Sequence, residues 1–544
     1  PHNWKIILTR NLRKYREYYT LPFVLTKYGR DYFRKAENIT INQNIRKTKN
    51  FYFRPYTILN YDIMDKSTTY DLDNLGLDFS FSPSFSTKLK FSLNPDYSDV
   101  PMDNEMDIYN SRYLPTFEEN RYFFIEDFNI FGVDKNTFYT RDIIQPHYAV
   151  KFSGNTEHSS FGFLSTLDKE ITEKEVLEDS TIVNTLNNDN LYNIIAFRPS
   201  GKNYSIQMTL LSKMHNDYEN GKIINDYHNE VFHLAPEWEI SDNKTLWLNL
   251  NLSIKEEQNT ETKKGYYGKI GFNVIHNDFF ISLSTQRMSK DYQMDMGRIY
   301  EDDFYGWNLD VNYEKDINCA AVRELGSGVS LGEEIDNISN ELLERLFSIN
   351  FWIDYKFDLK LYLDFAYVKE LYYSQFFDKY RTGINLTWDR INWFYPKFAW
   401  NIIETLIYTL NNTYLGYYLQ YGISGDISKY LSYNLAVDHI IIEDVPEHPE
   451  VDDNYWISNF DFTISLSNNL SLTNGIRFNN YQWSEYKNYQ WSEYRDHLGI
   501  FSNFRWEYKP GSNLYLGYKS STDEINGEYT KDYELLYIKI SYTF

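Results

Sequence analysis

The chain has 544 residues, 18% aromatic side chains, 51 of them Tyr, and a formal charge of −23. This composition excludes an ordinary soluble domain, whose core would be richer in Leu, Val and Ala, and the acidic balance excludes nucleic acid as a partner of the whole chain. A transmembrane helix is also excluded, because the sequence has no run of 18 or more apolar residues.

The first 54 residues differ from the rest in charge. They hold 13 Lys and Arg against 3 Asp and Glu, whereas the remainder holds 41 against 74. We expect residues 1–54 to form a basic segment leading into the next domain, either solvated or facing an anionic lumen or anionic lipid. The chain starts PHNWKIILTR, with neither an initiator Met nor a signal sequence, which indicates a mature or truncated product.

Residues 95–145 interrupt the alternating pattern that precedes them and ends at Leu93. The stretch is dense in carboxylates, which leaves calcium binding or acid–base chemistry open. It lacks EF-hand spacing, however, and no spacing sets two carboxylates opposite each other. We therefore interpret it as a structured loop inside a lumen, a plug or constriction, with Arg112 and Arg121 pairing with its acids.

Three motifs in this region resemble a known pattern. They are NPDYSDV from Asn94, FEENRYFFIEDFNIF from Phe117 and FYTRDI from Phe138. Together they are similar to the signature of an uncharacterised bacterial family, a predicted outer-membrane barrel preceded by a domain resembling carbohydrate-binding module 9. WKIILTRNLR and the later RPY at 54–56 also resemble the family's start of the barrel. The matching positions are Asn94, Pro95, Asp96, Val100, Phe117, Glu119, Arg121, Phe123, Phe124, Glu126, Tyr139 and Arg141.

The resemblance is specific over about residues 90–142 and only architectural elsewhere. Asp99 stands where the family usually has Gln, Asn120 where it has Lys, and Asp142 where it has a second Arg. The family has no established activity, so the resemblance implies a barrel and a plug motif but no reaction, and no glycan function is carried over.

Farther along the chain, period-two runs dominate. TLWLNLNLSI at 245–254 and FDLKLYLDFAYV at 357–368 place apolar side chains on one face and polar ones on the other. KIGFNVIHNDFFISLS at 269–284 reads as a hairpin that turns near Asn277 and Asp278. Somewhere above twenty such runs occur, most about ten residues long, which suits tilted membrane-spanning strands.

Residues 316–347 are predicted to be a partly helical loop. Gly326 and Gly328 come first, and then Ile335, Ile338 and Leu342 fall on one helical face. The stretches 170–190 and 443–454 are acidic and are predicted to be polar loops. In the second, His448 stands among acidic residues and leaves a divalent cation open; we predict no other cofactor.

The chain ends YELLYIKISYTF, with Leu536, Ile538, Ile540, Tyr542 and Phe544 on one face. We expect this face to contact lipid and the strand to pair with the first one, since an unpaired edge is not tolerated in hydrocarbon. Tyr542 and Phe544 would also serve as an assembly signal for the barrel-assembly machinery.

These patterns predict an all-β protein: a large antiparallel transmembrane β-barrel of roughly 22–26 strands over residues 55–544, in the outer membrane of a double-membraned bacterium. A propeller or sandwich is disfavoured because no periodic blade motif occurs. Outer-membrane lipid is the expected partner, and periplasmic or surface lipoproteins are left open.

Three functions fit this architecture. The first is a conduit or translocation pore, plugged and part of a larger envelope assembly, because so wide a barrel cannot be filled by its own strand side chains. The second is a surface protein whose acidic loops bind a partner. The third is an outer-membrane hydrolase, which we disfavour because G-x-S-x-G, H-E-x-x-H and P-loop motifs are absent; we predict that the chain is not an enzyme.

Overall fold

The chain divides into two compact units, Pro1–Asn50 and Phe51–Phe544. The computed structural model describes residues 2–12, 17–21, 36–41, 51–69, 74–84, 86–95, 97, 100–106, 116–169, 171–177, 180–187, 189–219, 222–298, 303–317, 319–391, 393–408, 410–445, 454–480, 483–487, 490–525 and 528–544.

The first unit contains two small antiparallel pairs. Strand β1 (His2–Ile6) pairs with β4 (Glu37–Ile41), and β2 (Leu8–Leu12) pairs with β3 (Glu17–Leu21). The proposed role of its basic side chains, facing a lumen or lipid, stays a prediction. The first barrel strand begins at Phe51, so the basic stretch 1–54 reaches into the barrel wall by four residues.

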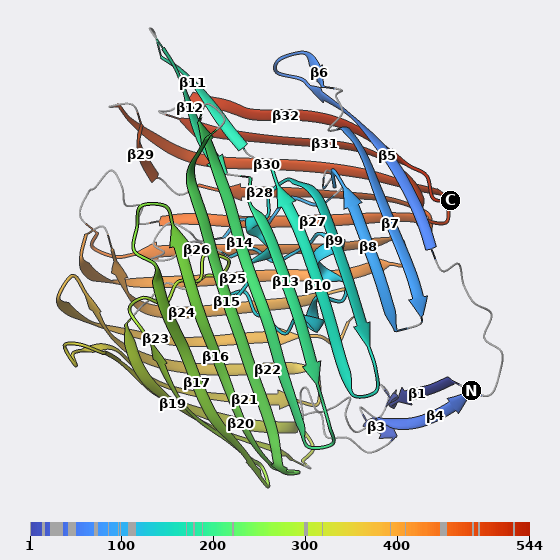
Figure 1. Cartoon of the computed structure of the whole chain (residues 1–544). Helices are drawn as coiled ribbons and strands as arrows, with labels where there is room; N and C mark the ends of the chain where they lie inside the picture. Colours follow the sequence, from blue (N-terminus) through green and yellow to red (C-terminus); the bar gives the residue numbers. More distant parts are fainter. Residues whose placement is uncertain are drawn as a thin grey trace. The chain divides into compact units, whose positions relative to one another are not determined.

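The second unit is a closed antiparallel barrel (Figure 1). Within the described residues the sheet contains 26 strands. Two of them, β6 and β29, are short and lie beside strands that pair directly, β5 with β7 and β28 with β30, so the wall itself has 24 strands. This confirms the predicted all-β transmembrane barrel and its strand number. The strands are β5 (Phe51–Asp62), β6 (Ser67–Thr69), β7 (Leu75–Ser84), β8 (Thr87–Leu93), β9 (Pro146–Asn155), β10 (Ser159–Asp168), β13 (Leu191–Pro199), β14 (Tyr204–Glu219), β15 (Lys222–Ser241), β16 (Lys244–Glu257), β17 (Lys263–His276), β18 (Phe279–Met288), β19 (Phe304–Asp316), β20 (Val322–Asp336), β21 (Leu342–Tyr355), β22 (Leu359–Tyr372), β23 (Gln375–Trp388), β24 (Tyr395–Ile407), β25 (Asn412–Ser428), β26 (Leu431–Ile442), β27 (Asn454–Ser467), β28 (Leu470–Asn479), β29 (Trp483–Lys487), β30 (Gln490–Lys509), β31 (Ser512–Ile525) and β32 (Glu528–Ser541).

The last strand closes the barrel against the first. β32 pairs with β5 from Leu535 opposite Asp62 to Ser541 opposite Tyr56. Beyond the strand, the backbone N–H of Phe544 donates to the Phe53 carbonyl at 3.1 Å. The predicted closure is therefore confirmed, whereas the role of Tyr542 and Phe544 as an assembly signal stays a prediction.

Strand β32 also shows which side of the wall meets lipid. Outward-facing Ile538 and Ile540 are 46% and 45% exposed, whereas inward-facing Tyr537 and Lys539 are 2% and 8% exposed. An exposed apolar face with a polar face turned inward is the reverse of a soluble protein and is typical of a transmembrane barrel. The protein is an integral outer-membrane barrel.

Replacing Ile538 with Arg should therefore destabilise the barrel in a bilayer by up to about 2–4 kcal/mol, and by less if this position lies near the interface. Thr473→Arg on the luminal face of β28 is the matched control, and we expect it to cost less because the lumen can hydrate the charge. Urea titration in lipid vesicles measures both. Equal losses would contradict the assignment of the lipid face.

Residues 316–347 do not form a partly helical loop. They run through the end of β19, all of β20 and the start of β21, with turns between these strands. The glycines that suggested a loop make room for cross-strand neighbours: a Cβ on Gly326 would lie 2.1 Å from the Trp352 ring. The helix-like spacing arose because Ile338 lies in the turn between two strands whose apolar residues flank it.

The connections differ between the two ends of the barrel. Antiparallel strands alternate their connections between the ends, and one end carries short turns, such as the one between β27 and β28. The other end carries the longest connections, including residues 94–145, 169–190 and 443–453; the hairpin β11 (Ile171–Leu177) and β12 (Ser180–Asn187) lies in the second of them. Short turns on one side and long loops on the other agree with the predicted pattern.

Three short helical turns lie in residues 94–145. They are α1 (Tyr122–Ile125), η3 (Phe128–Ile130) and η4 (Thr140–Asp142). In the part of the chain that the structure describes, no helix is long and apolar enough to cross a membrane.

Candidate functional site

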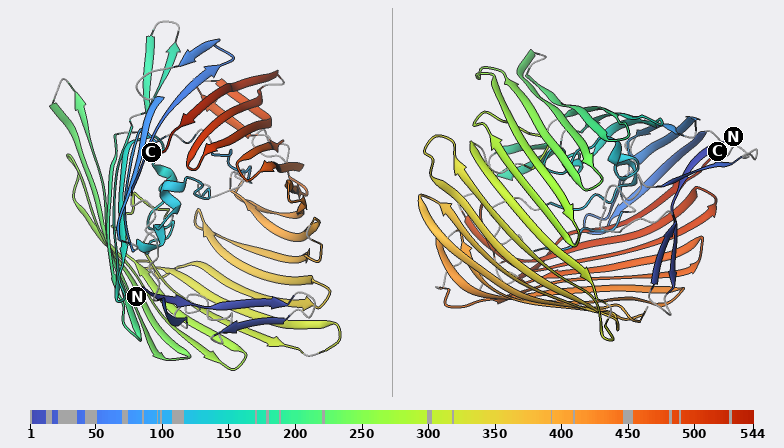
Figure 2. Two further views of the ribbon diagram at one scale, coloured as in Figure 1. Left: turned by 90° about the vertical axis from the view of Figure 1, so that its right-hand side faces the viewer. Right: turned by 90° about the horizontal axis from the view of Figure 1, so that it is seen from below.

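Residues 94–145 connect β8 and β9, and the described part of this connection (94, 95, 97, 100–106 and 116–145) lies inside the ring of strands (Figure 2). We call it the plug. It starts at Asn94, which adopts a left-handed conformation, φ 44°, that Asn tolerates better than most residues. Hydrogen bonds fix this turn: the Asn94 N–H donates to the His147 carbonyl at 2.7 Å, and the Tyr56 hydroxyl donates to the Asn94 carbonyl at 2.9 Å. The first motif thus turns the chain from the wall into the lumen.

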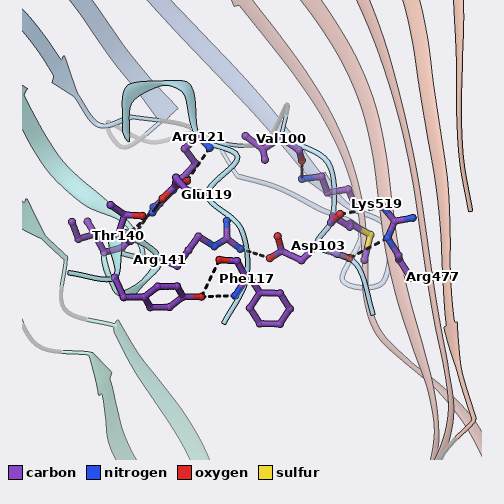
Figure 3. Close-up of polar contacts among 12 residues, drawn as sticks. Val100, Asp103, Phe117, Glu119, Arg121, Thr140, Arg141, Arg477 and Lys519 are labelled. Atoms are coloured by element: carbon purple, nitrogen blue, oxygen red, sulfur yellow. Dashed lines mark hydrogen bonds and ion pairs between the residues drawn. The ribbon is translucent and has the colours of Figure 1, made fainter. Parts of the chain in front are cut away.

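Arg121 organises the centre of the plug and is only 4% exposed. Its Nε and one terminal nitrogen donate to the two carboxylate oxygens of Glu119 at 2.8 and 2.7 Å (Figure 3). The guanidinium also donates to the carbonyls of Thr140 and Ile143 at 2.7 and 2.5 Å. One side chain therefore ties the second motif to the third, which lies about twenty residues later.

Aromatic rings complete the surroundings of Arg121. Its guanidinium carbon lies 5.0 Å from the ring centre of Tyr97 and 4.5 Å from that of Phe124. Burial raises the pKa of the Tyr97 hydroxyl, so this group stays neutral. The cation therefore lies between aromatic faces and a carboxylate, which offsets the cost of removing it from water.

Acid should loosen the plug around Glu119. Burial raises the pKa of this carboxyl, but the hydrogen bonds and the charge of Arg121 outweigh burial, so the pKa falls below its ordinary value. Stability from such a group is complete above its unfolded pKa, roughly 4.3, and is lost as pH falls through the folded pKa. Hydrogen exchange of residues 116–145, corrected for its intrinsic pH dependence, should show this loss in acid but none at neutral pH. Glu119→Gln should remove this loss of protection in acid. If the variant loses protection over the same pH range as the wild-type protein, Glu119 is not the group responsible.

The remaining motif residues also hold the plug together. Arg141 forms an ion pair with Asp103, and the Tyr139 hydroxyl accepts a hydrogen bond from the Phe117 N–H at 2.7 Å (Figure 3). Burial raises the pKa of Asp103 even though Arg141 lies beside it. Contacts of Arg121 with Thr140 and of Phe117 with Tyr139 therefore bring the second and third motifs together. Asp96 and Arg112, whose pairing with the acids of this stretch was also predicted, lie outside the described residues.

Glu126 anchors the plug to strands β8 and β9. Its carboxylate pairs with Lys88 and Lys90, both on β8. On β9, Lys151 donates from its ammonium to the backbone carbonyls of Phe123 and Glu126. This wall therefore supplies positive charge to the carboxylate and to the carbonyl ends of α1, where cations are favourable.

An apolar core joins the plug to the neighbouring strands β10 and β13–β15. On the plug side Phe124, Phe131, Phe138 and Ile143 are at most 2% exposed. A Cβ on Gly162 of β10 would lie 2.9 Å from the Phe131 ring, so the wall is hollowed where this ring packs. The wall contributes Leu164, Ile194, Ala196, Leu211 and Val231 to the same core.

A second inward loop, residues 289–298, was not anticipated from the sequence. Tyr292, Met294 and Met296 are buried in the same core, and the Tyr139 N–H donates to the Met296 carbonyl at 2.7 Å. Arg298 forms an ion pair with Asp142. The available signal was compositional: three of the eight methionines of the chain fall at 288–296, and flexible Met side chains suit irregular apolar gaps.

The start of the plug reaches a different sector of the wall, formed by β27, β28, β30 and β31. Lys519 of β31 donates to the Val100 carbonyl at 2.9 Å, and Arg477 of β28 donates to the Asp103 carbonyl at 3.1 Å (Figure 3). A cavity of about 590 Å³ lies between the plug and strands β30, β31 and β32, and residues of both line it. The plug therefore bridges two sectors of the barrel that are separated in the ring by β32, β5 and β7.

The predicted divalent-cation sites receive no support from the described residues, among which no group of three potential ligands is arranged around a common point. His448 and the neighbouring Glu447 and Glu450 lie outside the described residues. Cation binding at the acidic loops therefore stays a prediction.

No protein-family model and no curated protein matches the chain. Among solved structures, it is similar to the siderophore receptor PirA from Pseudomonas aeruginosa, with 8% identity and a TM-score of 0.46 over 92% of this chain and 81% of that one. It is also similar to the FrpB iron transporter from Neisseria meningitidis, with 9% identity and a TM-score of 0.47 over 91% and 82%. At this level the similarities carry no function to the chain, and its fold rests on the strand pairing described above.

Proposed function

We propose that the protein is a conduit through the outer membrane whose lumen is closed by the plug, and that it works within a larger envelope assembly. A barrel of 24 strands is too wide for its own strand side chains to fill. The observation that carries the proposal is the attachment of one continuous segment to two separate sectors of the inner wall, by an apolar core on one and by hydrogen bonds on the other.

The wall away from the plug supports passage of polar cargo. Strand pairing places small and polar side chains on the luminal face of β20–β23, and three carboxylates, Asp354, Asp364 and Glu370, lie among them. Each of these charges has a cationic partner: Arg323 pairs with Asp354, Arg381 with Asp364 and Lys379 with Glu370. Such a surface of paired charges and polar groups is wet.

The proposal is tested in cells of a double-membraned bacterium that produce the chain with and without residues 95–140. The deletion should make them sensitive to a large polar antibiotic that the outer membrane normally excludes, whereas the intact chain should leave sensitivity unchanged. Heat-modifiable migration on gels shows that both barrels have assembled. Equal resistance with assembled barrels would contradict a plugged conduit and favour the membrane-anchored surface protein.

A further inference from the structure

The inner wall formed by β27, β28, β30 and β31 binds residues 100–105 almost entirely through their backbone. Lys519 donates to the Val100 carbonyl, and Arg477 donates to the carbonyls of Met102 and Asp103 at 3.3 and 3.1 Å. We call residues 100–106 the strap.

Asn459 of β27 binds the other end of the strap. Its side-chain amide accepts a hydrogen bond from the Glu105 N–H at 2.8 Å and donates to the Glu105 carbonyl at 2.9 Å. This double hydrogen bond has the form of a backbone pairing, with an Asn side chain in place of a neighbouring strand. It satisfies the donor and the acceptor of one residue whatever the side chain of that residue.

The four strands present their groups along one oblique line across the wall. Asn459 lies opposite Arg477, and Arg477 lies opposite Gly499 of β30. On β31 Ser521 lies opposite Gly499, and Lys519 lies two residues away from Ser521. Three strand spacings of about 4.8 Å and two residue steps of about 3.3 Å along β31 make this line about 16 Å long, and an extended chain covers five residue steps in about 17 Å. The strap therefore crosses the strands with a fixed partner on each side of Gly499.

Gly499 provides the space between these partners. A Cβ at this position would lie 2.8 Å from the terminal methyl carbon of Met102. The only side chain of the strap that this wall binds by hydrogen bonding, among the described residues, is that of Glu105, which accepts from Asn479 at 2.7 Å. His497 lies 3.5 Å from the same carboxylate. The wall thus offers a notch for one side chain and a polar site for one carboxylate.

From this geometry we infer that the wall carries a binding site for an extended peptide segment with an acidic residue, and that the strap occupies this site as an internal ligand. Main-chain hydrogen bonds provide affinity and the two side-chain positions provide selectivity, as in other modes of peptide recognition. The inference rests on the proposed function, because a peptide reaches this wall only through the lumen. An incoming polypeptide segment would bind here when the strap leaves, so cargo binding and release of the plug compete for the same groups.

The test uses the full chain with residues 100–106 replaced by an equally long Gly/Ser segment. The probe is a fluorescein-labelled, end-capped peptide with the sequence VPMDNEM, and its anisotropy is measured with the assembled protein in detergent. We expect saturable binding. Adding Asn459→Ala and Lys519→Ala should weaken the binding at least tenfold, whereas Thr473→Ala, on the same wall outside the line, should leave it unchanged.

Two control peptides separate backbone recognition from general stickiness. Methylation of the nitrogen at the Glu105 position should weaken binding at least tenfold, because it removes the donor to Asn459, and Gln in place of that Glu should weaken it severalfold. Absence of binding at millimolar peptide, or equal binding to the double variant, would overturn the inference. Because no current or transport is measured, this outcome is independent of whether the barrel conducts.

The intact chain provides a second test if the replaced chain does not assemble. Asn459→Ala with Lys519→Ala should free the strap and raise its rate of proteolytic cleavage at least tenfold, while excess VPMDNEM should leave the rate unchanged because its site is disabled. In the wild-type sequence, excess peptide should raise the cleavage rate by displacing the strap. A wild-type rate that does not respond to the peptide would overturn the competition between peptide and strap.

Discussion

Replacing Arg121 with Met should release the plug while leaving the barrel assembled. The guanidinium pairs with Glu119 and donates to two backbone carbonyls from a position that is 4% exposed. Removing one partner of a buried ion pair costs about 3–5 kcal/mol, because the other charge stays buried. Hydrogen exchange of residues 116–145 should show that the free energy of local opening falls by this amount, while the wall strands keep their protection.

Arg141→Gln is the matched control for that variant. Arg141 also pairs with a plug carboxylate, Asp103, but both side chains are partly exposed, 21% and 30%. Arg141→Gln should therefore destabilise the plug much less, by about 1 kcal/mol or less. If the two variants open the plug equally, Arg121 is not the residue that organises it.

Replacing Phe131 with Ala should weaken the apolar core that attaches the plug to β10 and β13–β15. The Phe131 ring is 0% exposed and packs where Gly162 hollows the wall. Truncating a fully buried Phe costs about 3–5 kcal/mol, because the cavity cannot be filled by neighbours held in the sheet. Binding of a hydrophobic dye to the assembled barrel and hydrogen exchange of residues 128–143 measure the change.

Ile125→Ala provides the control, since this residue of α1 is 51% exposed. Its truncation should change the stability of the plug by less than about 0.5 kcal/mol. If hydrogen exchange shows the plug to be equally protected in the Phe131→Ala and Ile125→Ala proteins, the packing of Phe131 against β10 is contradicted.

The barrel could be predicted because its physics is local. Lipid on one side of each strand and water on the other force a period of two, and hairpins such as 269–284 show it directly in the sequence. The error at 316–347 came from reading Ile338 as part of a helical face, when it lies in a turn between two strands. A short turn flanked by apolar residues can imitate helical spacing. Gly326, which makes room for Trp352, and Gly328, which makes room for Asn312 and Asn350, strengthened the impression of a loop.

The plug could be located but its attachments could not. The dense carboxylates and the motifs around Arg121 marked the segment, since they stand out from alternating strands. Arg477 and Lys519 lie more than 370 residues from the carbonyls that they bind. A polar residue on the luminal face of a strand has the same local pattern whether it meets water or a plug, so only closure of the barrel in its true register reveals these partners.

Single-channel conductance of the purified chain in a planar bilayer, before and after deletion of residues 95–140, tests the closed conduit most directly. We predict a small or absent current from the intact chain and a large, steady current from the deletion. A large current from the intact chain, or none from an inserted deletion variant, would contradict the claim that this segment closes the lumen.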